Sequence, residues 1–437
     1  MNLKVLKFGG SSLADAKHFS IVADIVRAEK ERRYVVPSAP GKRFKEDEKV
    51  TDLLYKCHSL AADGKDIFDV FTRICQRYND IIRELSLDLS LEKEFAAIRE
   101  NLVSGATVDY AASRGEYLNG LILSAYLGFD FIDARDVIFF KEDGSLDAER
   151  TYSTMGAVLR EHEHAVIPGF YGAMPNGEIR TFSRGGSDLT GAIVARAVMA
   201  DIYENWTDVS GFMMADPRCI DNPRPIDTIT YKELRELSYM GATVLHEDAV
   251  FPVRSAGIPI NIRNTNDPSA KGTLIVPTAP EGENDSIITG IAGKVGFSII
   301  LIEKDMMNSE LGFGRRVLQV LEDNKINFEH LPSSIDTMCV VVKTNEIQGK
   351  RDKIMDELFR LTNPDSIVIH DGIALVAVVG RGMVRSKGTA ARIFTALANA
   401  GINIRMIDQG SSELNIIISV EESDYIPALR AIYNEFN

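Results

Sequence analysis

A glycine turn close to the N-terminus carries the residue types that bind a phosphate group. The segment Lys7–Ser12 reads KFGGSS, and it ends an apolar run, Leu3–Phe8, that is typical of a β-strand. A helix is expected to begin near Leu13, with Ser12 as its N-cap. Glycines let a phosphate approach backbone N–H groups, while the helix dipole and the Lys7 ammonium supply positive charge. Taken alone, the turn also fits an ordinary strand-to-helix connection with a solvated lysine.

Two later segments could bring charged groups to the same place. A second glycine turn, Ser183–Asp188 (SRGGSD), lies between a β-rich run and a helical pattern. A third segment follows the predicted strand Asp201–Trp206 and contains TDVSG and ADPR, the latter ending at Arg218. Ligands of open α/β sheets collect at the carboxyl ends of the strands, so we expect the glycine turns to converge on one crevice. There, Arg184 could hold a carboxylate bidentately.

Composition excludes several classes of protein. A chain of 437 residues with 45% hydrophobic residues can bury a sizeable core and is expected to hold two or three domains. The net charge of −14 argues against a broad nucleic-acid-binding surface. No apolar run is long enough to span a bilayer, and the four scattered cysteines suit reduced thiols, so no membrane partner and a cytoplasmic location are expected. The histidines show no metal-ligand spacing, so no metal site is predicted.

The order of strand and helix patterns predicts the fold class. Strands alternate with amphipathic helices through the first 275 residues, which indicates an α/β domain with a mostly parallel sheet covered by helices. A helical region is expected from Thr51 to about Leu127. The charged stretch before it, Gly41–Lys49, is interpreted as a solvated loop.

The C-terminal part contains an internal repeat. Gly312–Phe328 aligns with Gly388–Ile404 at an offset of 76 residues, and each copy reads strand, helix, strand, strand, helix. The second copy ends without a closing strand. Because an unpaired sheet edge is a liability, we expect a strand within 286–294 to cross over and complete it.

Four motifs in this order resemble those of the aspartate kinases: KFGGSS, then SRGE at Ser113–Glu116, then RGGSD, and finally TDVSG with ADPR. The resemblance covers nearly the whole chain. It implies an amino-acid-kinase catalytic domain over 1–275, a linker at 276–285, and two ferredoxin-like α+β ACT domains over 296–370 and 371–437. It also implies transfer of the γ-phosphoryl group of MgATP to the β-carboxylate of L-aspartate.

The resemblance assigns roles to individual residues. The expected ATP-binding residues are Lys7, Phe8, Gly9, Gly10, Thr207, Asp208, Met213, Arg218, Thr243 and Val244. The expected aspartate-binding residues are Thr51, Glu116, Phe170, Arg184 and Ser187. Of these, Glu116 would meet the α-ammonium group and Arg184 a carboxylate. Lys7 and Asp188 are the expected catalytic residues: Lys7 would neutralise the transferred phosphoryl group, and Asp188 would orient Lys7 or the waters of Mg²⁺, which would be held mainly by phosphates and water.

The chemistry explains the absence of an obvious catalytic histidine. The β-carboxylate of aspartate has an ordinary pKa of about 3.9, so it is ionised at neutral pH and needs no general base. Phosphoryl transfer asks the protein mainly for positioning and charge stabilisation.

Two departures from the family pattern concern the nucleotide. Met213 stands where the family often has tyrosine, and Thr243 where it often has lysine. We hypothesise that Lys42, Lys45 or Lys49 compensates for that lysine. Two alternatives stay open: another amino-acid kinase, for example one acting on glutamate, and an amino-acid-binding regulator without catalysis, which the two departures favour.

ACT domains imply an amino-acid effector at an interface between chains, and therefore at least a homodimer. The expected effector-binding residues are Met307, Glu310, Glu329, Ser333, Ser334 and Asp336. Two acids, Glu329 and Asp336, beside one pocket favour a cationic effector, which points to lysine rather than threonine. The alternative is that both acids are ordinary solvent-facing residues.

Overall fold

The computed structural model describes residues 2–183, 185–241, 245, 247–279 and 286–437. The chain divides into two compact units. The first comprises Met1–Phe212, Pro225–Tyr231 and Thr243–Ala279, and the second comprises Met213–Arg224, Lys232–Ala242 and Pro280–Asn437. Two short segments that precede residue 275 in sequence therefore belong with the C-terminal part of the chain. No helix among the described residues is long and apolar enough to cross a membrane.

The first unit is built on an eight-stranded sheet in the order β3-β4-β2-β1-β7-β9-β10-β8. Its strands are β1 (Lys4–Phe8), β2 (Arg32–Pro37), β3 (Asp130–Phe131), β4 (Ala165–Val166), β7 (Ile202–Thr207), β8 (Thr228–Thr230), β9 (Ile260–Asn264) and β10 (Thr273–Val276). Every neighbouring pair is parallel except β9 and β10. A separate hairpin pairs β5 (Tyr171–Ala173) with β6 (Ile179–Thr181). The predicted α/β class with a mostly parallel sheet is confirmed.

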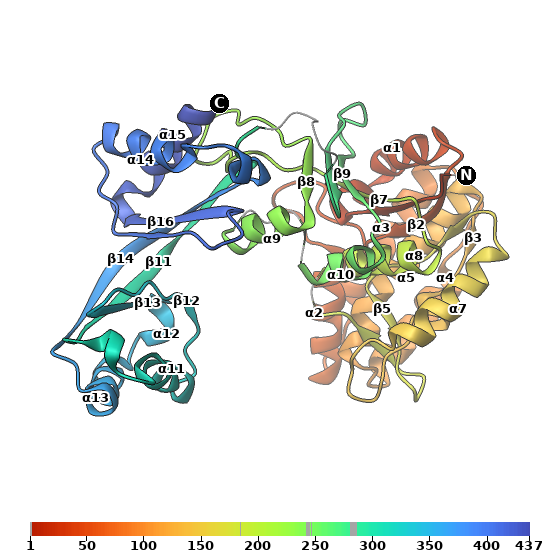
Figure 1. The fold of residues 1–437 in the computed structure, drawn as a ribbon. Coiled ribbons are helices and arrows are strands. Elements are labelled where there is room, and N and C mark those ends of the chain that lie inside the picture. The colour runs from red at the N-terminus through yellow and green to blue at the C-terminus, as the bar shows by residue number, and fades with distance from the viewer. Residues whose placement is uncertain (1, 184, 242–244, 246, 280–285) are drawn as a thin grey trace. The chain divides into compact units, whose positions relative to one another are not determined.

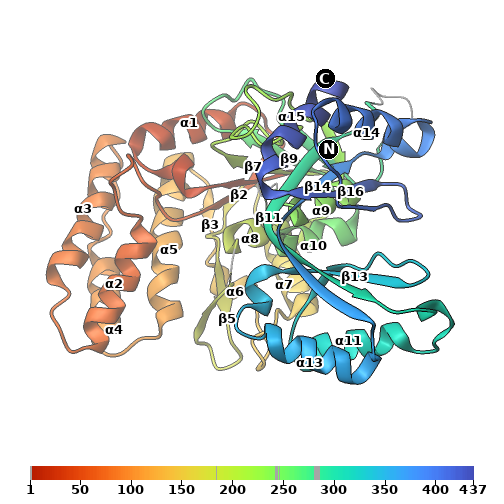
Figure 2. The same cartoon turned by 90° about the vertical axis from the view of Figure 1, so that its left-hand side faces the viewer.

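Helices cover both faces of this sheet. They are α1 (Ala16–Arg27), α2 (Val50–Ala62), α3 (Phe68–Glu84), α4 (Glu92–Val103), α5 (Val108–Leu127), α6 (Ala134–Val137), α7 (Ala148–Arg160), α8 (Gly186–Ala197) and α10 (Glu247–Ala256). On one face Leu6 and Phe8 of β1 share a core with α1 to α5, and α2 to α5 form the bundle visible in Figure 2. On the other face α8 packs against β1, β2 and β7. Since side chains alternate along a strand, Lys7 points to the α8 face.

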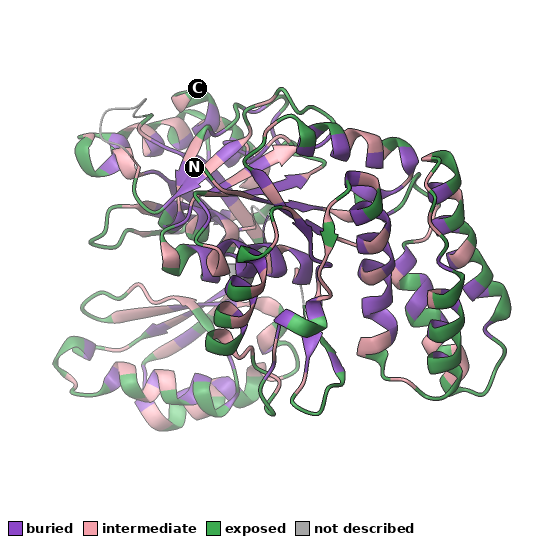
Figure 3. Ribbon diagram, turned by 90° about the vertical axis from the view of Figure 1, so that its right-hand side faces the viewer, coloured by how far each residue is buried: buried purple, intermediate pink, exposed green. Residues whose placement is uncertain are grey.

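Burial follows this layered arrangement. Figure 3 shows that the central strands are almost entirely buried, whereas the helices of the bundle are exposed on their outer sides. On β1, Val5, Leu6 and Phe8 are fully buried, and Lys7 is only 8% exposed. A lysine this deep requires a charged partner.

The chain after the first glycine turn differs from the prediction. Residues Gly10–Leu13 form a short 3₁₀ helix, and α1 begins only at Ala16, where the side chain of Asp15 accepts a hydrogen bond from the backbone N–H of His18 at 3.0 Å. The prediction that Ser12 caps an α-helix near Leu13 is therefore wrong. The reason is tertiary: the Ser12 hydroxyl is buried in a 2.7 Å hydrogen bond with the Thr265 hydroxyl.

The second unit contains a six-stranded antiparallel sheet in the order β12-β13-β11-β14-β16-β15. Its strands are β11 (Gly290–Glu303), β12 (Phe328–His330), β13 (Thr337–Lys343), β14 (Ser366–Val379), β15 (Met406–Asp408) and β16 (Asn415–Glu421). Its helices are α9 (Tyr231–Tyr239, all but the first residue), α11 (Phe313–Asp323), α12 (Thr344–Ile347), α13 (Arg351–Thr362), α14 (Thr389–Asn399) and α15 (Tyr425–Phe436). Figure 1 shows β11 and β14 running side by side, with α11 and α13 near one end and α14 and α15 near the other.

The two long strands are shared between the two copies of the repeat. Residues 290–294 of β11 pair with 375–379 of β14, which in turn pair with β16, whereas 297–303 pair with β13 and with 366–373 of β14. The strand predicted within 286–294 is not a separate element but part of β11, which, like β14, is one strand of 14 residues. The pairing register shifts between Lys294 and Phe297, where Gly296 takes a φ of +90°, so a glycine-containing bulge replaces the expected break.

Candidate active site

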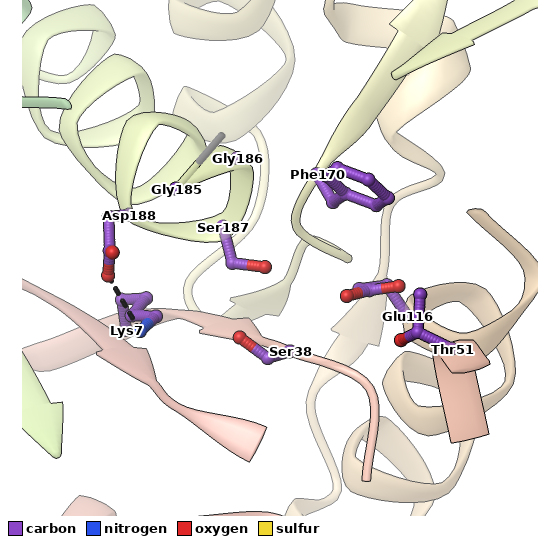
Figure 4. Close-up of a pocket in the computed structure, with 9 residues that line it drawn as sticks. All are labelled: Lys7, Ser38, Thr51, Glu116, Phe170, Gly185, Gly186, Ser187 and Asp188. Atoms are coloured by element: carbon purple, nitrogen blue, oxygen red, sulfur yellow. Dashed lines mark ion pairs between the residues drawn. The ribbon is translucent and has the colours of Figure 1, made fainter. Parts of the chain in front are cut away.

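Two adjoining cavities lie in the first unit. The smaller, of about 220 Å³, is lined by Lys7, Ser38, Thr51, Glu116, Phe170, Gly185, Gly186, Ser187 and Asp188 (Figure 4). The larger, of about 620 Å³, is lined by Gly9, Gly10, Ser11, Ser38, Ala39, Pro40, Gly41, Lys42, Phe44, Lys45, Lys49, Thr51, Glu116, Thr207 and Asp208. They share Ser38, Thr51 and Glu116. The two glycine turns meet here, as predicted from the carboxyl ends of the strands.

An ion pair between Lys7 and Asp188 joins the two turns. The Lys7 Nζ lies 2.6 Å from the Asp188 Oδ1, and the Asn205 side-chain amide donates to the same oxygen at 2.9 Å. These residues come from β1, α8 and β7 respectively. Lys7 is the only cationic side chain among the described residues that line the smaller cavity. It lies at the end of the cavity away from Glu116 (Figure 4).

Glu116 is a buried carboxyl group that lines both cavities. It lies on α5, is 5% exposed, and its Oε2 has no hydrogen-bond partner among the described residues. Burial raises the pKa of Glu116 to about 8, so the group is mostly protonated at neutral pH in the free site. The neighbouring Gly115 allows this burial, because a Cβ there would lie 2.7 Å from the Ala39 Cβ.

A tight turn before β5 packs against the start of α8. Phe170 has a φ of +81°, a strained conformation for a residue other than glycine, and its N–H donates to the Thr190 hydroxyl at 3.0 Å. A Cβ on Gly186 would lie 2.4 Å from the Phe170 ring, and one on Gly169 would lie 2.6 Å from the Ser187 Oγ. This contact places Ser187, at the first turn of α8, in the wall of the smaller cavity.

The structure brings most of the predicted substrate residues together. Thr51, Glu116, Phe170, Ser187, Lys7 and Asp188 line the smaller cavity, and Gly9, Gly10, Thr207 and Asp208 line the larger one. The side chain of Phe8 instead stacks on Trp206 in the core, at 6.0 Å between ring centres.

Two other predicted residues lie elsewhere, and three lie outside the described residues. Met213 and Arg218 belong to the second unit and line neither cavity, and Arg218 pairs with Asp216 of its own segment at 2.6 Å. Arg184, Thr243 and Val244 lie outside the described residues.

Sequence reasoning missed Ser38 and Asn205, and it interpreted the Gly41–Lys49 loop as solvated. Ser38 directly follows β2, which neighbours β1 in the sheet, so it could have been found from the same strand-end argument. Lys42, Lys45 and Lys49 all line the larger cavity. Among the described residues, no group of three or more His, Cys, Asp and Glu side chains could hold a metal ion.

The predicted effector residues have partners within the second unit. Glu310 pairs with Lys304 at 2.7 Å and with Arg316. The side chain of Glu329, only 3% exposed, lies 3.3 Å from the Lys343 ammonium and accepts a hydrogen bond from the Tyr239 hydroxyl.

The remaining predicted effector residues lie near the turn that precedes α11. Met307 is buried in the core, whereas Ser333, Ser334 and Asp336 are exposed. The Asp336 Oδ1 accepts from the backbone N–H of Met306 at 2.9 Å. The two acids Glu329 and Asp336 therefore have separate partners.

Comparisons with known proteins agree along the whole chain. Residues 2–264 match the amino acid kinase family, and residues 376–436 match the ACT domain. The chain is 37% identical to aspartokinase 3 of Bacillus subtilis, over 99% of this chain and 98% of the relative.

Solved structures of aspartate kinases are also similar. The crystal structure of Clostridium acetobutylicum aspartate kinase is 52% identical, covers 100% of both chains and superposes with a TM-score of 0.91. Aspartokinase III of E. coli in complex with aspartate and ADP is 25% identical over 99% of both chains, with a TM-score of 0.72. Its complex with lysine and aspartate, also 25% identical over 99% of both chains, has a TM-score of 0.71.

Proposed function

Because this chain belongs to the aspartokinases, within the amino acid kinase family, we propose that its two adjoining cavities hold the two substrates of phosphoryl transfer from ATP to aspartate. As an aspartate kinase with an ACT region, it converts L-aspartate to 4-phospho-L-aspartate. One observation carries the assignment of the cavities. The Lys7–Asp188 pair lines a small cavity that shares a wall with the cavity of the Gly9–Gly10 turn.

In this proposal the smaller cavity binds aspartate. Glu116 meets the α-ammonium group, because a buried carboxyl whose Oε2 has no partner among the described residues is stabilised as an anion when a cation enters. Thr51 and Ser187 offer hydroxyls, and Ser187 also lies at the N-terminus of α8, which favours a carboxylate. Arg184, which lies outside the described residues, is the further residue that we propose to bind a carboxylate of aspartate.

The larger cavity binds the nucleotide in this proposal. The N–H of Gly9 donates to the Trp206 carbonyl at 3.0 Å, so the N–H of Gly10 is the donor of this turn that approaches the phosphates. Thr207 and Asp208 contact the nucleotide. Lys7 stabilises the negative charge that develops on the transferred phosphoryl group, and Asp188 holds the Lys7 ammonium in place. The aspartate carboxylate is the nucleophile and needs no base.

We propose that Mg²⁺ enters with the nucleotide. Besides Glu116, two aspartates line the two cavities. Asp188 is taken by Lys7 and Asn205, whereas Asp208 is exposed and accepts only from the Thr207 hydroxyl, at 3.1 Å, among the described residues. This donor set fits a cation held mainly by phosphates and water. When bound, Mg²⁺ supplies further neutralisation of phosphate charge.

Hydroxylamine trapping tests the activity. The protein is incubated with MgATP, hydroxylamine and one amino acid at a time, and an acyl phosphate is detected as its hydroxamate. We expect product with L-aspartate. Product with glutamate alone would identify a different amino-acid kinase, and no product with any amino acid would identify a regulator without catalysis.

We further propose that lysine is the feedback effector and that it binds the first ACT domain. The domain assignment is 296–370 and 371–437, with residues 286–294 completing the second and 276–285 as the linker from the catalytic domain. Support comes from the lysine complex of the E. coli relative and from the exposed Asp336 carboxylate near the turn before α11. Glu310, a further proposed contact, is already paired with Lys304 and Arg316. Met307, Glu329, Ser333 and Ser334 are the other proposed contacts.

We also propose that the protein forms a homodimer or a higher homo-oligomer, and sedimentation analysis tests this oligomeric state.

A further inference from the structure

We propose that the loop Gly41–Lys49 is a second phosphate-binding element, in which Lys42, Lys45 and Lys49 bind the β- and γ-phosphates of the nucleotide in the larger cavity. The proposal rests on ATP as the substrate of this site and adds a binding element to it. Three observations support it. The loop is fastened to the Gly9–Gly10 turn and to α3, its arginines and two of its acids are paired, and its lysines line the larger cavity without an ion-pair partner among the described residues.

The loop starts in direct backbone contact with the Gly9–Gly10 turn. The N–H of Gly41 donates to the carbonyl of Gly10 at 2.8 Å. A Cβ on Gly41 would lie 2.6 Å from the carbonyl carbon of Gly10, and a Cβ on Gly10 would lie 2.7 Å from the carbonyl oxygen of Ala39. The absence of side chains at both glycines therefore allows the two phosphate-facing segments to lie against one another.

The far end of the loop is fastened to α3. The Asp47 carboxylate accepts hydrogen bonds from the backbone N–H of Arg43 at 3.0 Å, from the Arg43 Nε at 2.9 Å and from the Arg77 Nη2 at 2.8 Å. The same Arg77 nitrogen donates to the carbonyl of Gly41 at 2.9 Å. These hydrogen bonds from Arg43 and Arg77 hold the pKa of Asp47 well below its usual range. One buried arginine thus ties both ends of the loop to the same helix.

This attachment uses the arginines and two acids of the loop but not its lysines. Glu48 pairs with Arg73 on α3, and Asp47 pairs with Arg43 and Arg77. Lys42, Lys45 and Lys49 are exposed and form no ion pair with any described residue. The third acid of the loop, Glu46, does not line the cavity. The loop is therefore held in shape by one set of charges while a second set remains free for a ligand.

The free charges define the chemical class of the ligand. Besides the three lysines, the larger cavity is lined by two acids, Glu116 and Asp208, and Glu116 is mostly uncharged at neutral pH. The balance is positive on a chain whose net charge is −14, so this cavity suits a ligand with several negative charges. Lysine ammonium groups act as point charges on phosphates and do not read a base. They should therefore discriminate nucleotides by the number of phosphates.

The test compares two triple variants with the same change in net charge. One carries Lys42→Gln, Lys45→Gln and Lys49→Gln. The other carries Lys17→Gln, Lys30→Gln and Lys93→Gln, which are exposed lysines of the first unit that line neither cavity. Calorimetry without aspartate measures the affinities for ATP, ADP and AMP in the presence of Mg²⁺, at low and high salt. Thermal melts confirm that both variants are folded.

In the loop variant we expect the ATP affinity to fall at least about tenfold, the ADP affinity to fall less, and the AMP affinity to stay within about twofold. The ATP affinity of the loop variant should also depend less on salt than that of the wild type. The control should bind all three nucleotides like the wild type.

Equal ATP affinities in the loop variant and the control would overturn the proposal. So would an AMP loss as large as the ATP loss, because the lysines would then contact the nucleoside monophosphate. Failure of this proposal is distinct from failure of the proposed function: hydroxamate formation from aspartate reports the reaction, whereas binding of ATP without aspartate reports the loop.

Discussion

The sequence predicts that charged residues lie together in two regions, the substrate cavities and the effector region. The structure shows this in the substrate cavities but not for the two acids of the effector region. In the first unit, charged residues far apart in sequence converge, and Lys7 and Asp188 lie 2.6 Å apart. In the second unit, Glu329 and Asp336 are seven positions apart, yet their carboxylates have separate partners, Lys343 and the backbone of Met306. The carboxyl edge of a parallel sheet gathers residues by topology, whereas nearness in sequence along an antiparallel hairpin gives no such convergence.

The largest effect is expected for Lys7, which lines the smaller substrate cavity. Lys7→Ala should lower kcat about 100-fold or more, as for the loss of a group that stabilises charge in the transition state, and change aspartate binding little. Steady-state kinetics with aspartate varied at saturating ATP measure kcat and the KM for aspartate. Lys65→Ala, on the surface with Asp63 as its partner, is the control. A decrease in kcat of less than about fivefold would show that Lys7 does not stabilise the transition state.

The next effect concerns Glu116 and pH. Its pKa is raised to about 8 by burial, and the ammonium of aspartate should bind only the ionised form. Below pH 8, binding must release this proton, so the KM for aspartate should fall about tenfold per pH unit as pH rises from 6 towards 8.

Glu116→Gln removes this titration. The variant should raise the aspartate KM and abolish its pH dependence, with the ATP affinity nearly unchanged. Calorimetry in two buffers of different ionisation enthalpy measures the proton released on binding. A wild-type KM that is flat between pH 6 and 8 would contradict the assignment of Glu116 to the ammonium group.

A smaller effect is expected in the effector region, where it tests whether the two acids Asp336 and Glu329 contribute unequally to effector binding. Asp336→Asn should raise the lysine concentration for half inhibition about tenfold, which corresponds to about 1.4 kcal/mol of coupling. Glu329→Gln should raise it less, because Lys343 already neutralises Glu329. Both variants should keep the uninhibited kcat. Inhibition by threonine alone in the wild type would reject lysine as the effector, and a larger effect at Glu329 would reverse the order of the two acids.

The smallest effect separates the glycine turn from the helix after it. Asp15→Ala removes the N-cap of α1 and should lower the free energy of unfolding by about 1 kcal/mol. The KM for ATP should stay the same, because Gly9, Gly10 and Ser11 line the cavity and the first turn of α1 does not. Denaturant unfolding and steady-state kinetics measure the two quantities. A several-fold rise in the ATP KM would show that the α1 terminus contributes to the phosphate site.

The amino-acid sequence by itself determined the features that depend on local pattern. Short apolar runs that alternate with amphipathic helices predict the mostly parallel sheet, and glycines at strand ends predict the two turns. Self-similarity at an offset of 76 residues predicts the repeated unit. The ordered motifs were also sufficient to identify the family. Each of these signals lies within a short window of sequence or in the order of such windows.

Tertiary structure alone decided which polar groups are taken and which remain free. Ser12 does not cap α1, because its hydroxyl meets Thr265, which is 253 positions later in the chain. The loop residue Asp47 is held by Arg77 of α3, and this pairing leaves the lysines of the loop without an ion-pair partner among the described residues, lining the larger cavity. The carboxyl of Glu116 has its pKa raised to about 8 because the fold buries it, although a backbone hydrogen bond from Ala39 partly opposes this rise. Hydrogen bonds and burial act between residues that the fold brings together, so no local pattern carries this information.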